Sequence, residues 1–195
     1  MRTELWAAKV DRELSEEETR RMTELLPPQR RERLERMRDS AARREALCAW
    51  TLLRMALWEA LGWESLPEVE VTELGKPNFV GYSDVQFSIS HTSGAVLVGI
   101  SNLPIGVDVE RIRAVSPRVM RRVGGVDTPE EFFRRWVALE AKGKRSGWGV
   151  LSMLDEGRRL WGSDSYQPLR IFPGYVAGAA VSPGCTVPEV RVFTI

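Results

Sequence analysis

The sequence predicts an α+β fold made of two similar halves. Helical periodicity is concentrated in two long stretches, residues 29–61 and 128–145, whereas short apolar or alternating segments typical of strands lie on both sides of Pro104. In addition, segment 95–101 resembles segment 175–182 in length, composition and position after a polar turn. A chance likeness between two apolar strands explains this internal similarity equally well.

Composition limits what the protein can be. The 195 residues are 43% hydrophobic, which is enough for a buried core, and the net charge of +1 argues against a general nucleic-acid-binding protein. A single histidine and two cysteines without Cys-x-x-Cys spacing argue against a structural zinc site. No signal-peptide pattern and no membrane-spanning apolar run are recognisable, so a cytoplasmic protein is expected. The leading functional hypothesis below further expects a monomer.

The first half, residues 1–102, is expected to open with a strand near residues 1–10 and a short helix. Ser15 is a typical N-cap, and Pro27-Pro28 ends that helix. Apolar residues recurring every three or four positions predict one long helix over residues 29–61, ended by Gly62. Strands are predicted at 69–72, 85–90 and 95–101, with turns at 75–78 and 91–94.

The second half, residues 103–195, follows a linker at 101–104. Its first strand is predicted at 105–110, and the next helix begins at Ser116-Pro117 and ends at Gly124-Gly125. Thr128, Pro129 and Glu131 predict a capped helix that runs to about Arg145. Short strands are then expected at 160–161, 169–172, 175–182 and 189–194.

The strand at 105–110, Ile-Gly-Val-Asp-Val-Glu, carries two carboxylates. Because side chains alternate between the two faces of a strand, Asp108 and Glu110 are expected on the same face. Like charges at this spacing repel, so a metal cation, a basic side chain or water must offset them. We favour a divalent metal ion.

Glu140 and Lys144 lie four residues apart on a predicted helix, and are therefore neighbours on one of its faces. Such a pair is commonly a solvated ion pair that contributes little stability. If this helix packs near Asp108, however, Glu140 completes an oxygen-rich site suited to Mg²⁺, and Lys144 can neutralise a phosphate oxygen.

The first half offers candidates for phosphate contacts. Lys76 lies in a Gly-Lys-Pro turn, and Ser90 and His91 end a predicted strand. A turn lysine is usually only solubilising, and a lone histidine often caps a turn. Together with the pair Arg43-Arg44, these residues nevertheless form a plausible clamp for phosphate groups.

Four segments, in this order along the chain, resemble the motifs of one family. They are Gly75-Lys-Pro77, Phe87-Ser-Ile-Ser-His-Thr92, Ile105-Gly-Val-Asp-Val-Glu110 and Trp136-Val-Ala-Leu-Glu-Ala-Lys-Gly-Lys144. Each segment alone is a weak signal, but the four together resemble the 4′-phosphopantetheinyl transferases of the surfactin-synthetase type. The resemblance covers about residues 43–149.

This resemblance implies two pseudo-twofold halves with coenzyme A in the cleft between them. It implies transfer of 4′-phosphopantetheine from coenzyme A to a serine of an apo carrier protein, with release of 3′,5′-ADP. Matching positions make Asp108, Glu110 and Glu140 the Mg²⁺ ligands. Glu140 would also be the base for the incoming serine, and Lys144 would hold the phosphate. The nucleotide phosphates would be bound by Lys76, Ser90, His91 and either Arg43 or Arg44.

The chain departs from the family's pattern at Ser88, where Asn is common, and at Leu139, where Lys is common. Neither departure removes a metal ligand. An arginine-rich run follows the strand predicted at 105–110. We interpret it as a docking surface for an acidic carrier protein, although a solvated helix face explains it equally well. The run comprises Arg111, Arg113, Arg118, Arg121 and Arg122.

Two other functions stay open at this point. One is a degenerate homologue that binds coenzyme A or a carrier domain without turnover, against which the intact set Asp108, Glu110, Glu140 and Lys144 argues. The other is a different Mg²⁺-dependent phosphotransferase or nucleotide hydrolase. The absence of a Gly-x-x-x-x-Gly-Lys-Ser/Thr motif argues against the commonest version of it.

Overall fold

The computed structural model describes residues 3–73, 75–148 and 165–195. Its strands form two main sheets and one two-stranded ribbon. The first sheet has the order β4 (Gln86–Thr92), β5 (Ala95–Ser101), β1 (Glu4–Lys9) and β9 (Val190–Thr194). The second has the order β6 (Gly106–Arg111), β8 (Tyr175–Val181) and β7 (Ser165–Leu169), and the ribbon pairs β2 (Val69–Val71) with β3 (Pro77–Phe79).

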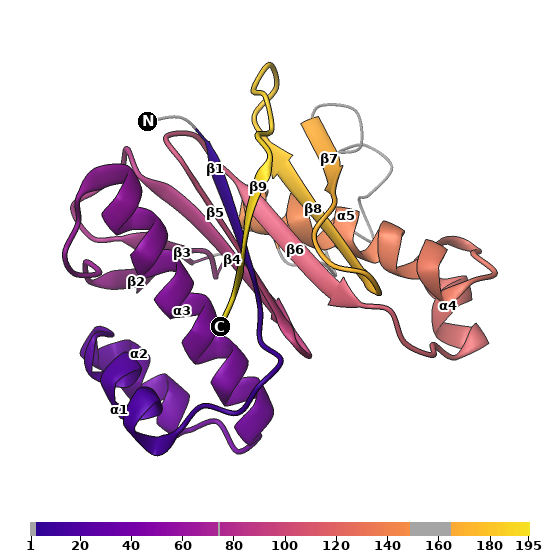
Figure 1. Ribbon diagram of the computed structural model, residues 1–195. Coiled ribbons are helices and arrows are strands. Elements are labelled where there is room, and N and C mark those ends of the chain that lie inside the picture. The colour runs from indigo at the N-terminus through magenta and orange to yellow at the C-terminus, as the bar shows by residue number, and fades with distance from the viewer. Residues whose placement is uncertain (1–2, 74, 149–164) are drawn as a thin grey trace.

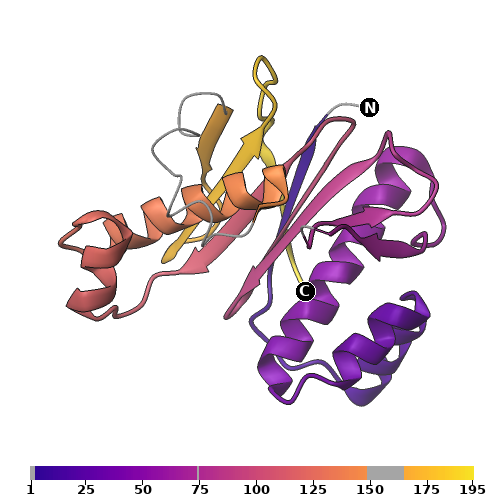
Figure 2. The ribbon, with the colours of Figure 1, turned by 180° about the vertical axis from the view of Figure 1, so that it is seen from behind.

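Helices cover the outer faces of the two sheets, as Figures 1 and 2 show. Helix α3 (Ser40–Leu61) packs on β4 and β5 of the first sheet, flanked by α1 (Glu16–Glu24) and α2 (Pro28–Glu35). Helix α5 (Pro129–Ser146) packs on β6 and β8 of the second sheet, with α4 (Pro117–Gly124) at its start. This mixture of helices and mainly antiparallel sheets agrees with the predicted α+β class. None of the helices in the described residues is long and apolar enough to cross a membrane.

The hydrophobic core lies in two main parts. One lies between α3 and the first sheet, where Leu52, Phe87 and Val98 are almost completely buried. The other lies between the two sheets, where the opposite face of the first sheet meets Val107 and Val109 of β6. Because the valines of β6 point into this core, Asp108 and Glu110 share the opposite face, which confirms the expectation from the sequence.

The helix starts follow the local sequence signals, with one correction. Ser15 and Glu18 form the capping box of α1, and Thr128 accepts a hydrogen bond at the start of α5. The single helix predicted over 29–61 is wrong, because the chain forms two helices, α2 and α3. Asp39 is the N-cap of α3 and accepts a hydrogen bond from the Ala42 backbone at 3.0 Å, so a new helix begins there.

Three strand boundaries also differ from expectation. Strand β4 continues to Thr92, which leaves a tighter turn at Ser93-Gly94, and β3 begins inside the predicted turn at 75–78. The strand predicted at 169–172 lies earlier in the chain than expected, since β7 spans Ser165–Leu169 and ends where the predicted segment begins. The strand predicted at 160–161 lies outside the described residues.

The two strands of the internal sequence similarity occupy equivalent places. Strand β5 lies between β4 and β1, and β8 lies between β6 and β7, so each is a middle strand with antiparallel neighbours. The C-terminal strand β9, however, pairs in parallel with β1 and therefore extends the first sheet. The Phe193 ring stacks on Trp6 at a centroid distance of 4.9 Å, which fixes the C-terminus on the first half.

A row of hydroxyl groups joins the two sheets where the edge strands β4 and β6 run side by side. Ser88 Oγ accepts a hydrogen bond from the Val107 backbone at 3.0 Å. Ser90 Oγ accepts one from the Val109 backbone at 3.3 Å, and Thr92 Oγ1 accepts a longer one from the Arg111 backbone at 3.5 Å. We call these three side chains the hydroxyl seam. They satisfy donors of the β6 edge that a neighbouring strand would otherwise pair.

Helix α5 approaches β6 as closely as two backbones can. A Cβ atom added to Gly106 would lie 1.9 Å from the Ala141 carbonyl oxygen and 2.4 Å from the Arg145 nitrogen. Only glycine leaves room for this contact, because a real Cβ atom does not come that close to backbone atoms. Gly106 therefore sets the distance between the strand that carries Asp108 and the helix that carries Glu140 and Lys144.

The hydroxyl seam predicts a stability loss for Ser88→Ala. The substitution leaves the buried Val107 N–H without its acceptor, which costs about 1 to 3 kcal/mol of unfolding free energy. Urea unfolding of the purified protein measures this loss, with Ser65→Ala at an exposed serine as the control. Equal stability of the two variants would show that the seam does not hold the sheets together.

Candidate functional site

A cavity of about 460 Å³ lies where the helices and strands before residue 92 face the C-terminal part of α5. Its walls come from α2, α3, β4, the β2–β3 ribbon and the C-terminal part of α5. Most of its titratable lining residues are basic, and Glu140 is the one acidic side chain among them in the described part of the chain. The charged or ionisable lining residues are Arg30, Arg33, Lys76, His91, Glu140 and Lys144.

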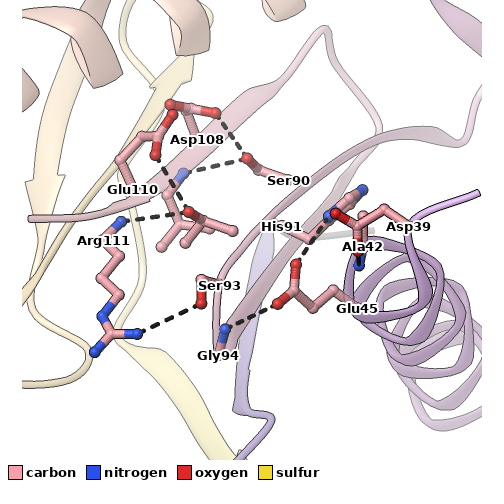
Figure 3. A network of polar contacts seen from close by, with 12 residues as sticks. Asp39, Ala42, Glu45, Ser90, His91, Ser93, Gly94, Asp108, Glu110 and Arg111 are labelled. Carbon is pink, nitrogen blue, oxygen red and sulfur yellow. Dashed lines mark hydrogen bonds and ion pairs between the residues drawn. The ribbon is translucent and has the colours of Figure 1, made fainter. Parts of the chain in front are cut away.

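Asp108 lies beside the cavity and is tied to both halves. The Lys144 ammonium contacts Asp108 Oδ1 at 2.6 Å. Ser90 Oγ donates a hydrogen bond to the same oxygen at 2.7 Å, as Figure 3 shows. The side chain is almost completely buried, and this loss of hydration raises the pKa of Asp108, although Lys144 opposes the shift. The sequence indicates that a positive charge or water must offset the charge of Asp108, and in the structure Lys144 supplies that positive charge.

Glu110, the second carboxylate of β6, has its own partners. Thr92 Oγ1 donates a hydrogen bond to Glu110 Oε2 at 3.2 Å, and Arg113 forms an ion pair with the same oxygen at 2.8 Å. Ser90 and Thr92 therefore each accept a hydrogen bond from β6 and donate one to a carboxylate of β6. The hydroxyl seam orients both acidic side chains.

Glu140 lines the cavity from α5, and the charges of both β6 carboxylates affect its pKa. Loss of hydration raises the pKa of Glu140, and the negative charges of Asp108 and Glu110 raise it further, while Lys144 lowers it. The condition set by the sequence, that this helix packs near Asp108, is therefore met. A half-buried carboxylate with a raised pKa is a better proton acceptor than an exposed one.

The three carboxylates can be compared with what Mg²⁺ requires. Asp108 Oδ2 is buried and makes no hydrogen bond, which leaves one carboxylate oxygen available to a cation. Within residues 3–73, 75–148 and 165–195, no three acidic, histidine or cysteine side chains are already grouped around a common point as metal ligands. The carboxylate oxygens of Asp108, Glu110 and Glu140 are donors of the kind that Mg²⁺ prefers. In this structure, however, the Lys144 ammonium supplies the positive charge beside Asp108.

Lys76 joins the cavity to the end of α5. Its ammonium donates a hydrogen bond to the Arg145 carbonyl oxygen at 3.1 Å, across 69 positions of sequence. Loss of hydration, with help from the positive charge of Arg145, lowers the pKa of Lys76 to about 8. An anion entering the cavity would favour the charged form of this lysine.

The predicted phosphate contacts separate into two groups. Lys76 and His91 line the cavity, whereas Ser90 is buried and points to Asp108. Neither Arg43 nor Arg44 lines it: Arg43 is exposed, and Arg44 forms an ion pair with Glu13.

The cavity wall contains two other arginines, Arg30 and Arg33, which the sequence analysis did not identify as phosphate contacts. Arg30 and Arg33 project from α2, and the Arg30 guanidinium lies 4.6 Å from the centre of the Trp50 ring. Arg30 is buried, and its Nε makes no hydrogen bond. Their three-residue spacing on a helix was the available signal, but α2 was expected to be part of one long helix, which obscured its orientation.

The arginine-rich run begins at the end of β6 and continues on α4, which packs at the start of α5, whereas the cavity is lined by the C-terminal part of α5. Arg113 pairs with Glu110 and lies over the Phe133 ring, at 4.7 Å from its centre. Arg111 is exposed and donates a hydrogen bond to Ser93 at 3.4 Å. Arg118 and Arg121 are exposed on α4, and the side chain of Arg122 lies outside the described part of the structure.

Comparison with known proteins identifies relatives of this chain. The 4′-phosphopantetheinyl transferase Sfp of Bacillus subtilis (strain 168) is 24% identical over 90% of this chain and 86% of the relative. Another 4′-phosphopantetheinyl transferase of Bacillus subtilis is 25% identical over 77% of this chain and 73% of the relative. The 4′-phosphopantetheinyl transferase gsp of Aneurinibacillus migulanus is 36% identical over 38% of this chain and 27% of the relative.

All four curated relatives found are named 4′-phosphopantetheinyl transferases, which confirms the resemblance inferred from the four motifs. No family model matches the chain.

The lowered pKa of Lys76 predicts a pH dependence of stability. Between about pH 8 and the ordinary lysine pKa of 10.5, the unfolded chain binds more protons at this site than the folded chain, so stability rises with pH. The gain is about 2 to 3 kcal/mol, and Lys76→Met should remove it. Urea unfolding at about pH 7.5 and about pH 10 compares this variant with Lys9→Met, an exposed control. A gain retained in Lys76→Met would contradict the assignment.

Proposed function

Because this chain is a relative of the 4′-phosphopantetheinyl transferases, we propose that it transfers 4′-phosphopantetheine from coenzyme A to a serine of an apo carrier protein. The serine oxygen forms a bond to the phosphorus next to the pantetheine, the pyrophosphate P–O bond breaks, and 3′,5′-ADP leaves. The observation that carries this proposal is the convergence of Asp108, Glu140 and Lys144 beside a basic cavity between the two halves. Such a reaction depends on positioning and charge neutralisation.

The nucleotide phosphates are proposed to bind in the basic cavity. Lys76 and His91 line it, together with Gly75 and Pro77 on either side of Lys76. Arg30 and Arg33 add two guanidinium groups, which suit phosphate geometry. Arg43 and Arg44 are weaker candidates because the cavity wall does not include them. Ser90 acts through Asp108, to which it donates a hydrogen bond.

Asp108, Glu110 and Glu140 are proposed to hold Mg²⁺ when the substrate is bound. The ion would supply charge neutralisation on the pyrophosphate. The available Asp108 Oδ2 supports this assignment. Lys144 is then free to exchange its contact with Asp108 for a phosphate oxygen, because a lysine side chain rotates readily about its four-carbon stem.

Glu140 is proposed as the base that accepts the proton of the carrier serine. A serine hydroxyl is a weak nucleophile and needs such a base. The raised pKa of Glu140 suits this role, since it makes the carboxylate more basic than an exposed one. Lys144 stands one helical turn away and can stabilise the leaving phosphate.

We further propose that residues 1–102 and 103–195 are pseudo-twofold halves with the substrate between them. The equivalent middle strands β5 and β8 support this, and β9 is then an arm of the second half that crosses to the first sheet. The arginine-rich run on and before α4 is proposed to dock an acidic carrier. We also propose that the enzyme works in the cytoplasm, since two cysteines without Cys-x-x-Cys spacing suit a reducing compartment, and that it works as a monomer.

Turnover distinguishes this function from a degenerate homologue that only binds coenzyme A or a carrier. Incubation with coenzyme A, Mg²⁺ and a panel of apo carriers should add one phosphopantetheine mass to a carrier, as read by intact-protein mass spectrometry. Asp108→Ala and Glu140→Gln should each reduce the rate by about 100-fold or more, whereas the exposed control Glu64→Gln should not. A chelator should stop the reaction and added Mg²⁺ should restore it. A mass gain in no carrier would favour the degenerate homologue.

The docking proposal predicts a separate effect. Charge reversal of Arg118 and Arg121 to glutamate should raise the KM for the carrier by about tenfold, because complementary charges steer the encounter, while the affinity for coenzyme A stays the same. Arg38→Glu, an exposed reversal on the other half, is the matched control. Equal KM values for both variants would exclude α4 as the docking surface.

A further inference from the structure

Glu45 is a buried carboxylate directly behind the one histidine of the chain. It lies on α3, is only 6% exposed, and accepts a hydrogen bond from the Gly94 backbone at 3.1 Å through Oε1. Its other oxygen, Oε2, lies 3.9 Å from His91 Nδ1, as Figure 3 shows. The carboxylate thus joins α3 to both the last residues of β4 and the turn that follows.

This contact orients the imidazole. With Nδ1 directed at Glu45, the other ring nitrogen is left for a ligand in the cavity that His91 lines. At 3.9 Å the contact is too long for a hydrogen bond, but it becomes an ion pair when the ring is protonated. A carboxylate behind an imidazole commonly fixes both the direction and the basicity of the ring.

The charges around His91 come from every element packed against it. Helix α3 also supplies Arg44 beside Glu45. Strand β6 supplies Asp108 and Glu110, which accept hydrogen bonds from Ser90 and Thr92 on either side of His91. The groups that share the cavity with His91 are Arg30 and Arg33 of α2, Lys76 of the β2–β3 ribbon, and Glu140 and Lys144 of α5. Loss of hydration and the Lys144 ammonium lower the pKa of His91, while burial raises the pKa of Glu45.

We propose that Glu45 is a positioning residue that holds His91 toward the cavity and stabilises the proton that His91 takes up when a phosphate-bearing ligand binds. Without a ligand, a neutral imidazole stands beside a carboxylate. A phosphate anion at the open ring nitrogen favours the imidazolium, and Glu45 then balances its charge in a cavity that already holds four basic side chains. Binding consumes a proton, so affinity falls as pH rises.

The inference rests on the proposed function in taking coenzyme A as the ligand, but its test does not depend on turnover. Because the chain has one histidine, a single imidazole resonance reports its protonation in the full-length protein without assignment. The experiment follows this resonance by NMR over a pH series, alone, with coenzyme A, and with inorganic pyrophosphate as a second probe. The variants are Glu45→Gln, which keeps an acceptor for Gly94, and the exposed control Glu64→Gln.

In the unmodified protein and in Glu64→Gln, ligand should raise the pKa of His91 by about one unit or more. In Glu45→Gln, the ligand-free pKa of His91 should be lower, and the rise on binding should be reduced by at least half. The ligand Kd should weaken about fivefold or more at slightly acid pH, with little change at alkaline pH, where His91 is neutral in both proteins. A purely structural role for Glu45 would weaken binding equally at every pH.

The possible failures are distinguishable. If coenzyme A does not bind but pyrophosphate shifts the His91 titration as described, the proposed function fails and the role of Glu45 stands. If coenzyme A binds and Glu45→Gln titrates like the unmodified protein, the role of Glu45 is overturned while the proposed function stands. If neither ligand moves the His91 resonance, the inference is also overturned.

Discussion

The hydroxyl seam between β4 and β6 is the contact on which the rest of the site depends. Two sheet edges that share no backbone ladder are held together by three side-chain oxygens at alternate positions of one strand. Two of these oxygens also donate to Asp108 and Glu110. The same atoms therefore fix how β4 and β6 meet and where the acidic side chains point. A change in the contact between these two strands would also move the carboxylates.

Loss of hydration in and beside the cavity shifts acids and bases toward their neutral forms. The pKa values of Asp108 and Glu140 are raised, and those of Lys76 and His91 are lowered, for the same reason: each charged form loses hydration. An anionic ligand and a divalent cation would restore the charged forms of both groups together. These shifts support the proposal that the cavity binds a ligand with several negative charges, such as a pyrophosphate.

Local signals in the sequence were sufficient for most elements. The capping residues Ser15 and Thr128 identify helix starts, and alternating apolar residues identify β4, β5 and β6. The same-face placement of Asp108 and Glu110 follows from strand geometry alone. The division of 29–61 was missed because apolar spacing continues across Asp39, whose capping role is a single-residue signal.

What depends on contacts between distant segments was not predictable. Glu45 reads as one more residue of an amphipathic helix, and only the fold places it behind His91. Arg30 and Arg33 are hidden among many arginines of the same region. Ser88 looked like a departure from the family's motif, whereas its hydroxyl accepts a hydrogen bond from β6. Chain order carries no signal for such pairings, since they are set by packing.

Gly106 gives the active region an unusual mechanical property. Helix α5 already touches β6 at backbone contact, so the helix cannot move inward, and any outward movement displaces Glu140 and Lys144 together because they stand on one rigid helix. The backbone positions of Glu140 and Lys144 therefore keep a constant separation from each other whatever happens to the cavity. A change in the width of the cavity must therefore come from the wall formed by α2, α3 and the β2–β3 ribbon, because α5 is already in backbone contact with β6.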